Sequence, residues 1–420
     1  KVGVPINIIA TIGLLMTVFG GKDLSQAATQ ITVSNELGQQ ETHYIPSESY
    51  RRRMAVFFWK NESGNTDLDW LQYGITELLV QDLQQDPFVL ANSPWNNFGN
   101  GSYARMRQAG FEDGLDVPRS LMREIADKAH RQYFVDGSLD QRDGEYIVTA
   151  NIWSTQSLEQ VAKLSERGWD LYAVIDSLSK QVKEALEVPE SSSRIAEDLP
   201  LVETYGESED ALKAYIQGLN ARLFENDFES SNEFFDQAVS ADPNFVLGWF
   251  LKSVNMVDSG DLPGAQEALS RAQKLDYRLP SRDQAQLKFM VYRLSGEHEK
   301  LMAFLNLQAQ IYDDSTSHNR LASIYMTTGE LEKAKTESLL ALDRDALNVG
   351  VLLRMAMLER ATGNMEAAID YARKYQEQRP EDIDAHLVMG DLLRDSGELD
   401  AAEEHYKQAQ IIQNSPVRPA

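Results

Sequence analysis

The sequence predicts an α+β protein with three parts: an N-terminal membrane helix, an α/β domain with a mixed sheet, and an all-α solenoid of helical hairpins. Three observations lead to this prediction. Residues 2–21 carry no charge, the apolar residues of 51–189 switch between helical and strand periods, and residues 211–412 repeat one pattern. The predicted order is a membrane helix at 2–21, a linker at 22–50, the α/β domain at 51–189, a linker at 190–210, the repeats at 211–412 and a tail at 413–420.

Composition narrows the classes of protein to consider. The chain has 420 residues, of which 42% are hydrophobic and 25% charged, so we expect at least two globular domains rather than disorder or a polytopic membrane protein. Its net charge of -25 would repel the phosphate backbone, which disfavours nucleic acid as a partner. Cysteine is absent, so disulfides, thiolate nucleophiles and cysteine-ligated metals are excluded.

The uncharged run from Val2 to Gly21 is long enough to span a bilayer, since about 20 helical residues rising roughly 1.5 Å each cover the hydrocarbon core. The alternatives are a cleaved signal peptide with a small-residue exit near Ser25-Gln26-Ala27, and a buried helix of a soluble domain. Because the chain starts at Lys1 and not at methionine, we expect more protein upstream. Lys1 and Lys22 balance, so charge leaves the membrane orientation open.

The region after the first predicted linker alternates between the two hydrophobic periods. Apolar runs predict strands at 54–59 and 89–91, and apolar residues at three- and four-residue spacing predict helices at 68–83 and 117–130. Alternating residues around Asp143-Gly144 predict a β-hairpin. The other predicted elements are strands at 133–139, 145–154 and 160–165 and a closing helix at 169–186, which together give a mixed sheet flanked by helices.

Three stretches of this region carry a family resemblance: AVFFWKNESGN, DWLQYGITELL and EIADKAHRQYFVDGSLDQRDGEYIVTANIW. They resemble the TolB-like amino-terminal domain found beside tetratricopeptide arrays in bacterial signalling proteins, over most of residues 54–189. Such regions follow a membrane span in certain serine/threonine kinases, class III cyclases and CadC-type winged-helix regulators, and the kinase type looks slightly closer. The resemblance implies a periplasmic, non-catalytic domain and supplies no catalytic motif.

From residue 211 onward the chain repeats at a regular interval, seen at the turns between paired helices. The intervals are 34, 36, 33, 34 and 34 residues, and the turn residues that define them are Asn226, Gly260, Gly296, Gly329, Gly363 and Gly397. A helix-turn-helix period of 34 is that of the tetratricopeptide repeat. In the third hairpin, Leu301 and Gln308 replace the small residues that let paired helices approach closely. Those small residues are Ala265, Ala334, Ala368 and Ala402, and Ala238, Ala272, Ala341 and Ala409.

A stack of such hairpins presents a curved face of first helices that can bind a peptide or a protein. Four candidate binding residues lie on it, each three residues before a turn glycine: Arg293, Met326, Arg360 and Arg394. The guanidinium groups of the three arginines could clamp the carboxylates of an acidic or C-terminal peptide. The alternative is that an arginine near a helix C-terminus only offsets the helix dipole.

The sequence gives no recognisable catalytic, cofactor or metal-binding pattern. Its six histidines are scattered, and His386 and His405 fall in one repeat but on different helices. No phosphate-binding glycine loop follows a predicted strand, and the glycine-rich residues 97–101 indicate a flexible loop, with a small-ligand loop as the alternative. We therefore expect no enzyme activity, cofactor or metal in these residues, although a kinase, cyclase or DNA-binding effector domain could precede Lys1.

Together these patterns predict the extracytoplasmic protein-binding scaffold or sensor region of a single-span signalling protein. It would lie in the bacterial inner membrane with most of the chain periplasmic, and it would bind a protein or peptide through the repeats. The alternative is a free-standing, membrane-anchored adaptor that assembles an envelope protein complex. The serine- and proline-containing linker at 190–210 suggests that the two folded parts can reorient, and the oligomeric state stays open.

Overall fold

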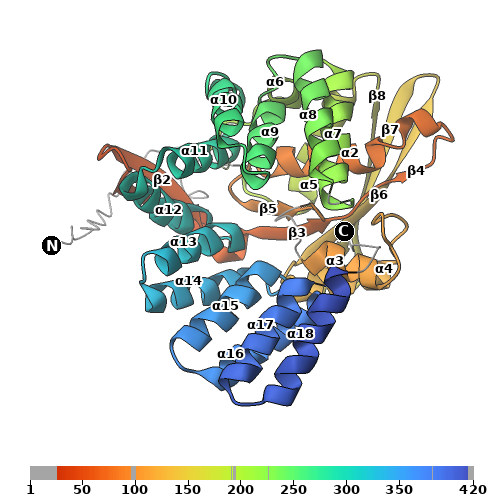
Figure 1. The fold of residues 1–420 in the computed structure, drawn as a ribbon. Coiled ribbons are helices and arrows are strands. Elements are labelled where there is room, and N and C mark those ends of the chain that lie inside the picture. Colours follow the sequence, from red (N-terminus) through yellow and green to blue (C-terminus); the bar gives the residue numbers. More distant parts are fainter. Residues whose placement is uncertain are drawn as a thin grey trace. The chain divides into compact units, whose positions relative to one another are not determined.

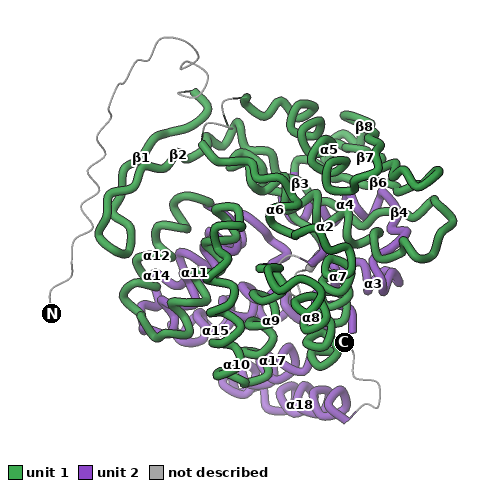
Figure 2. Tube along the Cα trace, turned by 90° about the horizontal axis from the view of Figure 1, so that it is seen from above, with its two compact units in different colours: residues 1–93, 132–222, 227–312 green, residues 94–131, 223–226, 313–420 purple. Residues whose placement is uncertain are grey.

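The structure is a computed structural model that describes residues 26–95, 101–190, 192, 195–225, 227–380 and 382–414. The chain divides into two compact units, which Figure 2 colours separately. The first unit contains residues 1–93, 132–222 and 227–312, and the second contains residues 94–131, 223–226 and 313–420. Each unit therefore combines residues of the predicted α/β region with part of the helical repeats.

A mixed β-sheet lies in the first unit, as the hydrophobic pattern predicted (Figure 1). Its strand order is β5-β3-β6-β7-β8, with β4 paired to β6. β3 runs parallel to both β5 and β6, whereas β6, β7 and β8 form an antiparallel meander. The strands are β3 (Arg52–Val56), β4 (Lys60–Asn61), β5 (Val89–Asn92), β6 (Tyr133–Arg142), β7 (Glu145–Ser154) and β8 (Gln160–Gly168).

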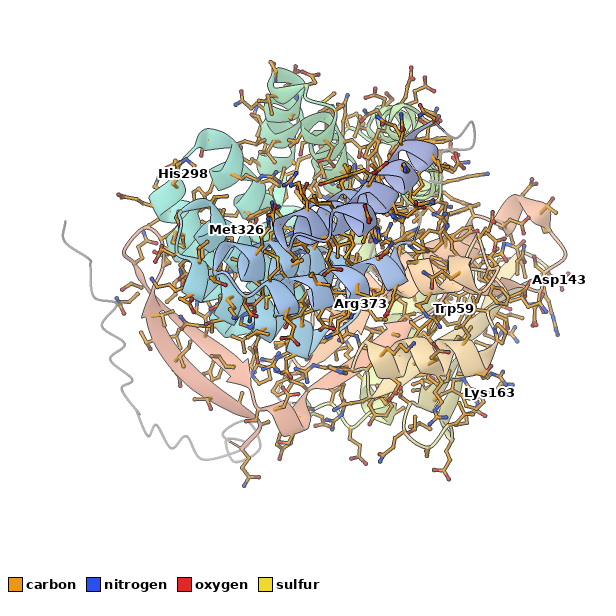
Figure 3. All side chains as sticks on the ribbon, turned by 60° about the horizontal axis from the view of Figure 1, so that its bottom comes forward. Trp59, Asp143, Lys163, His298, Met326 and Arg373 are labelled. Atoms are coloured by element: carbon orange, nitrogen blue, oxygen red, sulfur yellow. The ribbon has the colours of Figure 1, made fainter. Side chains whose placement is uncertain are left out.

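Helices α2 (Leu71–Leu83) and α5 (Leu171–Ala185) pack on this sheet and on each other. Their apolar stripes are buried at helical spacing, so this layer is the core of the α/β region. Trp59, labelled in Figure 3, is 1% exposed and lies directly over Gly137 of β6. A Cβ atom at Gly137 would come within 1.6 Å of the Trp59 ring, so this position requires glycine.

Residues 28–46 form a β-hairpin of β1 (Ala28–Ser34) and β2 (Gln40–Pro46) inside the segment for which the sequence predicted a linker. The base of the hairpin packs in a small core around Ala27, Ala28 and Phe88. The sequence reasoning missed it because its strands mix threonine, glutamine and histidine with isolated Ile and Val, which is a weak strand signal.

The described residues from 209 to 414 form six helical hairpins, as the 34-residue period predicted. Gly260, Gly296, Gly329, Gly363 and Gly397 all have φ between 72° and 85°, a left-handed conformation that glycine adopts without strain. The hairpins pair α7 (Glu209–Leu223) with α8 (Phe228–Ala241), α9 (Val246–Asp258) with α10 (Leu262–Gln273), α11 (Ser281–Ser295) with α12 (His298–Tyr312), α13 (Ser315–Thr327) with α14 (Leu331–Arg344), α15 (Val349–Ala361) with α16 (Met365–Gln378), and α17 (Ile383–Asp395) with α18 (Leu399–Gln413).

The segment between the sheet and the first hairpin is hydrogen-bonded to the α/β region. The Gln85 side chain exchanges two hydrogen bonds of 2.8 Å with the Leu199 backbone, and the Ser192 hydroxyl donates to Asp86 at 2.6 Å. Because these side chains are buried, breaking the bonds would leave polar groups without partners. The segment also contains a short helix, α6 (Leu201–Tyr205).

Glu77 of α2 joins the α/β region to the repeats within the first unit. Its carboxyl accepts hydrogen bonds from the hydroxyls of Tyr205 in α6 at 3.3 Å and Tyr215 in α7 at 3.1 Å. Burial raises the pKa of Glu77, although the hydrogen bonds from Tyr215, Gln81 and Tyr205 oppose it. Burial also raises the pKa of Asp283, at the start of α11, to about 7, and Glu77 adds to this rise.

In the second unit, residues of the α/β region reach the C-terminal ends of second helices. Arg131 forms an ion pair with Asp345 at 3.1 Å, with both side chains at most 7% exposed, and donates to the Arg344 carbonyl at the end of α14. Gln108 donates to the Gln378 carbonyl at the end of α16 at 2.9 Å. Such ends carry free carbonyls and partial negative charge, which these donors satisfy. The flanking helices are α3 (Gly101–Gln108) and α4 (Arg119–Lys128).

The predictions of a membrane helix and of a single-pass inner-membrane protein are wrong for the structure described. None of the helices that the structure describes is long and apolar enough to cross a membrane. Residues 2–21, where the span was predicted, lie outside the described residues. The described fold is a β-rich N-terminal region followed by helical hairpins. Length and lack of charge are necessary for a span but not sufficient, because Pro5, Asn7 and Thr11 weaken the same run.

Candidate protein-binding site

The last three hairpins, α13 to α18, are regular, and each helix packs on the next one along the chain. Alanines are buried where the helices meet, and at 0 to 3% exposure they leave no room for larger side chains. Arg354 of α15 donates to the backbone carbonyl of Asn319 in α13 at 3.1 Å, which ties two first helices directly. The buried alanines are Ala334, Ala341, Ala368, Ala372, Ala402 and Ala409.

The structure brings some of the predicted binding residues together. Arg293 is exposed on α11 in the first unit, whereas the other three lie in the second unit. Met326, labelled in Figure 3, is half-buried near the end of α13. Arg360 of α15 and Arg394 of α17 bind the same two carboxylates, Asp391 and Asp395. These two arginines therefore belong to one charge cluster.

The geometry of this cluster balances its charges. Arg360 Nε donates to Asp395 Oδ2 at 2.8 Å, and Arg394 Nη1 lies 3.1 Å from Asp391 Oδ1. The Tyr406 hydroxyl of α18 donates to Asp391 Oδ1 at 2.7 Å. Hydrogen bonds from Arg360 and Arg394 lower the pKa of Asp395. Two guanidinium groups thus face two carboxylates, so the cluster carries little net charge.

Two exposed apolar side chains lie beside the charge cluster. Met357, 44% exposed, precedes Arg360 by three residues, and Leu387, 42% exposed, precedes Asp391 by four. Residues three or four apart on a helix share a face, so the apolar and charged side chains form one surface. We call this surface the first-helix face. It comprises Met326, Met357, Arg360, Leu387, Asp391, Arg394 and Asp395.

A matching arginine in the first unit shows the structural role that such a residue can have. Arg222, near the end of α7, forms an ion pair with Asp258 of α9 and a hydrogen bond with Asn255. Arg360 bridges to Asp395 of the following first helix in the same way. Arg222 is 8% exposed, whereas the Arg360 side chain is 34% exposed. The Arg360 bridge therefore ties neighbouring hairpins and remains open to solvent.

Sequence reasoning missed most residues of the first-helix face. Asp391, Asp395, Met357 and Leu387 were not among the candidates, although the four-residue spacing of Asp391 and Asp395 places them on one face of α17. Arg222 was missed because the first turn is one residue longer: the Asp227 amide bonds back six residues to Ala221, whereas the Asp261 amide bonds back five to Met256.

His386 and His405 lie on different helices, as the sequence predicted, but they are neighbours in space. They lie on α17 and α18, and their Nδ1 atoms are 3.3 Å apart. His386 Nε2 contacts the Pro380 carbonyl at 3.0 Å. Within the described residues, no group of three or more His, Cys, Asp or Glu side chains could hold a metal ion. Residues 97–100, part of the glycine-rich loop, lie outside the described residues.

Comparison with known proteins identifies the repeats. Two models of the tetratricopeptide repeat match residues 315–346 and 353–419. No curated protein matches the chain. Three solved structures are similar to this chain. PilW, a type IV pilus biogenesis factor, has 16% identity and a TM-score of 0.38, over 49% of this chain and 94% of that one. For pilF of Pseudomonas aeruginosa the same values are 17%, 0.37, 49% and 94%, and for the APC/C heterotetramer Cut9-Hcn1 they are 16%, 0.41, 51% and 42%.

At these identities and TM-scores the solved structures support no conclusion about what this chain binds. The matches to the repeat models support a more general conclusion about the kind of protein, because they cover the three hairpins that carry the first-helix face. Tetratricopeptide repeats are non-catalytic motifs of protein interaction. Residues 315–346 and 353–419 of this chain are tetratricopeptide repeats, and the chain is similar in this part to protein-interaction scaffolds.

Proposed function

We propose that this chain is a protein-interaction scaffold that binds its partner on the first-helix face of α13, α15 and α17. One observation carries the proposal: Met357 and Leu387 are exposed side by side with an ion-paired cluster, on the hairpins that the repeat models match. Apolar side chains surrounded by paired charges are typical of a surface that becomes buried in a complex.

The charges of this face indicate the chemistry of the partner. Arg360 and Arg394 are already paired with Asp391 and Asp395, so a carboxylate of the partner would have to displace one of them. Clamping a carboxylate of the partner between the arginines therefore gains little binding free energy by itself, since one ion pair at a partly exposed site is exchanged for another. A partner segment that covers Met357 and Leu387 with apolar side chains and borders the charges with polar ones fits better.

The test uses the full chain and compares a double variant of the first-helix face with a single control variant. Met357→Asp with Leu387→Asp places charge on the first-helix face, whereas Leu339→Asp places it on α14, where Leu339 is also 44% exposed. Proteins captured by the wild type should be lost from the face variant by about tenfold or more and be retained by the Leu339 control. Equal capture by all three chains would contradict the proposed face.

The arginine clamp remains a second, narrower proposal. Arg360→Ala with Arg394→Ala removes both guanidinium groups, whose side chains are 34% and 50% exposed. If the partner presents an acidic or C-terminal peptide, its affinity should fall and should depend on salt concentration. Unchanged affinity would leave the two arginines with a structural role only.

The resemblance of residues 54–189 to TolB-like domains supports a finer proposal, that the scaffold serves a signalling protein. The competing proposal is an adaptor that assembles a protein complex. Purification under native conditions separates them: a large complex of fixed stoichiometry favours the adaptor, whereas an effector domain encoded upstream of Lys1 favours the signalling protein. Neither proposal assigns enzyme activity to these residues.

A further inference from the structure

The third helical hairpin, α11 with α12, departs from the repeat pattern, and it is also the hairpin that the β1–β2 hairpin contacts. Leu301 and Gln308 stand at two positions where four of the other five hairpins have alanine, and Leu301 is 2% exposed. β2 contacts α12. The departure from the repeat therefore coincides with an additional element packed on these helices, inside the first unit.

The loop between β1 and β2 places one carboxylate on α11. The Glu36 side chain is 1% exposed and forms an ion pair with Lys288. The Tyr292 hydroxyl, one helical turn after Lys288, donates to Glu36 Oε1 at 3.0 Å. The adjacent Leu37 is 57% exposed, so the loop turns Glu36 inward and leaves its neighbour in solvent. A buried charge with two specific partners is a built contact rather than a chance surface pair.

Aromatic rings hold the cation that binds Glu36. Lys288 Nζ lies 5.3 Å from the centre of the Phe304 ring of α12 and 6.0 Å from that of Tyr292. Lys300 Nζ of α12 also lies 6.0 Å from the centre of the Tyr292 ring. Cations over ring faces are attracted by the ring quadrupole, which helps to hold Lys288 beside Glu36. Lys300 forms an ion pair with Glu297. Helices α11 and α12 thus present a positively charged, aromatic-lined contact site.

The hairpin that carries Glu36 depends on such contacts for its order. A two-stranded hairpin is marginally stable alone, and Thr29, Gln30, Thr32 and Ser34 of β1 are exposed. Its base is fixed by the core around Ala27, Ala28 and Phe88, at the opposite end from the loop. Loss of the Glu36 contact would therefore free the loop end while the base stays attached.

We propose that α11 and α12 form a binding site for a carboxylate-bearing loop, and that the β1–β2 hairpin occupies this site as a releasable strap. The site is separate from the first-helix face of the second unit and does not depend on the function proposed for it. When the strap leaves, Lys288, Tyr292 and Phe304 become available to an acidic loop of the same chemistry.

Amide hydrogen exchange on the full chain tests the strap. Glu36→Gln or Lys288→Met should speed exchange in residues 29–34 and 40–45 by about tenfold, because a hydrogen bond to a charged group is lost. Exchange in α13 to α18 should stay unchanged. Glu41→Gln is the matched control, since Glu41 lies in the same hairpin but its carboxylate binds Asn35 and His43.

Two further measurements separate the site from a general loss of stability. The charge exchange Glu36→Lys with Lys288→Glu should restore at least part of the slow exchange, because the pair is re-formed with reversed signs. A free peptide of residues 26–47 should slow exchange at α11 in the Glu36→Gln chain, and the same peptide carrying E36Q should not. Hairpin exchange within twofold of wild type in both single variants, or equal action of the two peptides, would overturn the proposal.

Discussion

The first three helical hairpins and the last three follow the same repeat, and both sets receive a side-chain donor at the end of a second helix, since Arg51 donates to the Tyr312 carbonyl at the end of α12. They differ in the contacts that other parts of the chain make with first helices. In the first set, Glu77 binds Tyr215 of the first helix α7, and Glu36 binds Lys288 and Tyr292 of the first helix α11. In the last set, Arg131 and Gln108 bind carbonyls at the ends of the second helices α14 and α16.

This difference explains why one set offers a candidate binding surface and the other offers internal anchoring. Side chains of the first helices α7 and α11 are engaged by buried carboxylates of the same chain. Contacts at the ends of second helices satisfy free carbonyls and do not use the first-helix face. The same repeat can therefore serve as an internal support in one unit and as a surface for a partner in the other.

The largest expected effect compares the two bridging arginines. Arg222→Met should destabilise α7 and α9 by about 2–3 kcal/mol, since it leaves the buried side-chain oxygen Oδ1 of Asn255 without this donor and removes the ion pair with Asp258. Arg360→Met should cost less than about 1 kcal/mol, because its partners are partly exposed. Local amide exchange in each hairpin measures both. Equal losses of stability in the two variants would show that burial of the arginine does not distinguish the first three hairpins from the last three.

A smaller effect is expected from two glycines that face aromatic rings. A Cβ atom at Gly218 would lie 2.6 Å from Phe235, and one at Gly390 would lie 2.6 Å from Tyr406. Phe235 is fully buried and has no space to move, whereas Tyr406 is half-buried. Gly218→Ala should therefore destabilise the first hairpin by about 1–2 kcal/mol, whereas in Gly390→Ala the gain in helix propensity should offset most of the cost.

Thermal unfolding followed by amide exchange in α7 and α17 checks this pair. Gly218→Ala should speed exchange in α7 and leave α17 unchanged, and Gly390→Ala should leave both close to wild type. If Gly390→Ala proves the more damaging of the two, the last hairpin is packed as tightly as the first, and the contrast in packing between the two sets is incorrect.

The smallest effect concerns pH. The pKa values of Glu77 and Asp283 are raised by burial, that of Asp283 from 3.8 to about 7. The folded state then binds more protons than the unfolded state, so its stability is fully present below the unfolded pKa values and falls as pH rises toward about 7. The groups facing Glu77 are Tyr205, Tyr215, Gln81 and Asp283, and none is a cation.

Glu77→Gln keeps a hydrogen-bond acceptor for both tyrosines but cannot ionise. The melting temperature of the variant should therefore fall less between pH 5 and pH 7 than that of the wild type, by about 2–4 °C. Unfolding monitored by circular dichroism at both pH values measures the difference. Asp391→Asn, in the exposed cluster of the last set, is the control and should leave the wild-type pH dependence in place.

The sequence by itself determined the repeats, their turns and the alternation of the sheet, because these follow from local spacing. Glycines at 33- to 36-residue intervals have the left-handed turn conformation, and strands 133–142 and 145–154 pair around Asp143-Gly144 as the alternating pattern predicted. Uncharged length at residues 2–21 was a weaker guide, and the predicted membrane helix had to be corrected.

Only the tertiary structure decided which side chains meet. Arg360 and Arg394 were predicted from their spacing, but their pairing with Asp391 and Asp395 depends on how α15 packs against α17. Glu36 reaches Lys288 from a segment that the sequence predicted to be a linker, across 252 positions of the chain. Periodicity reports which face of an element is apolar, whereas a contact between distant residues depends on the packing of whole elements, which local spacing does not encode.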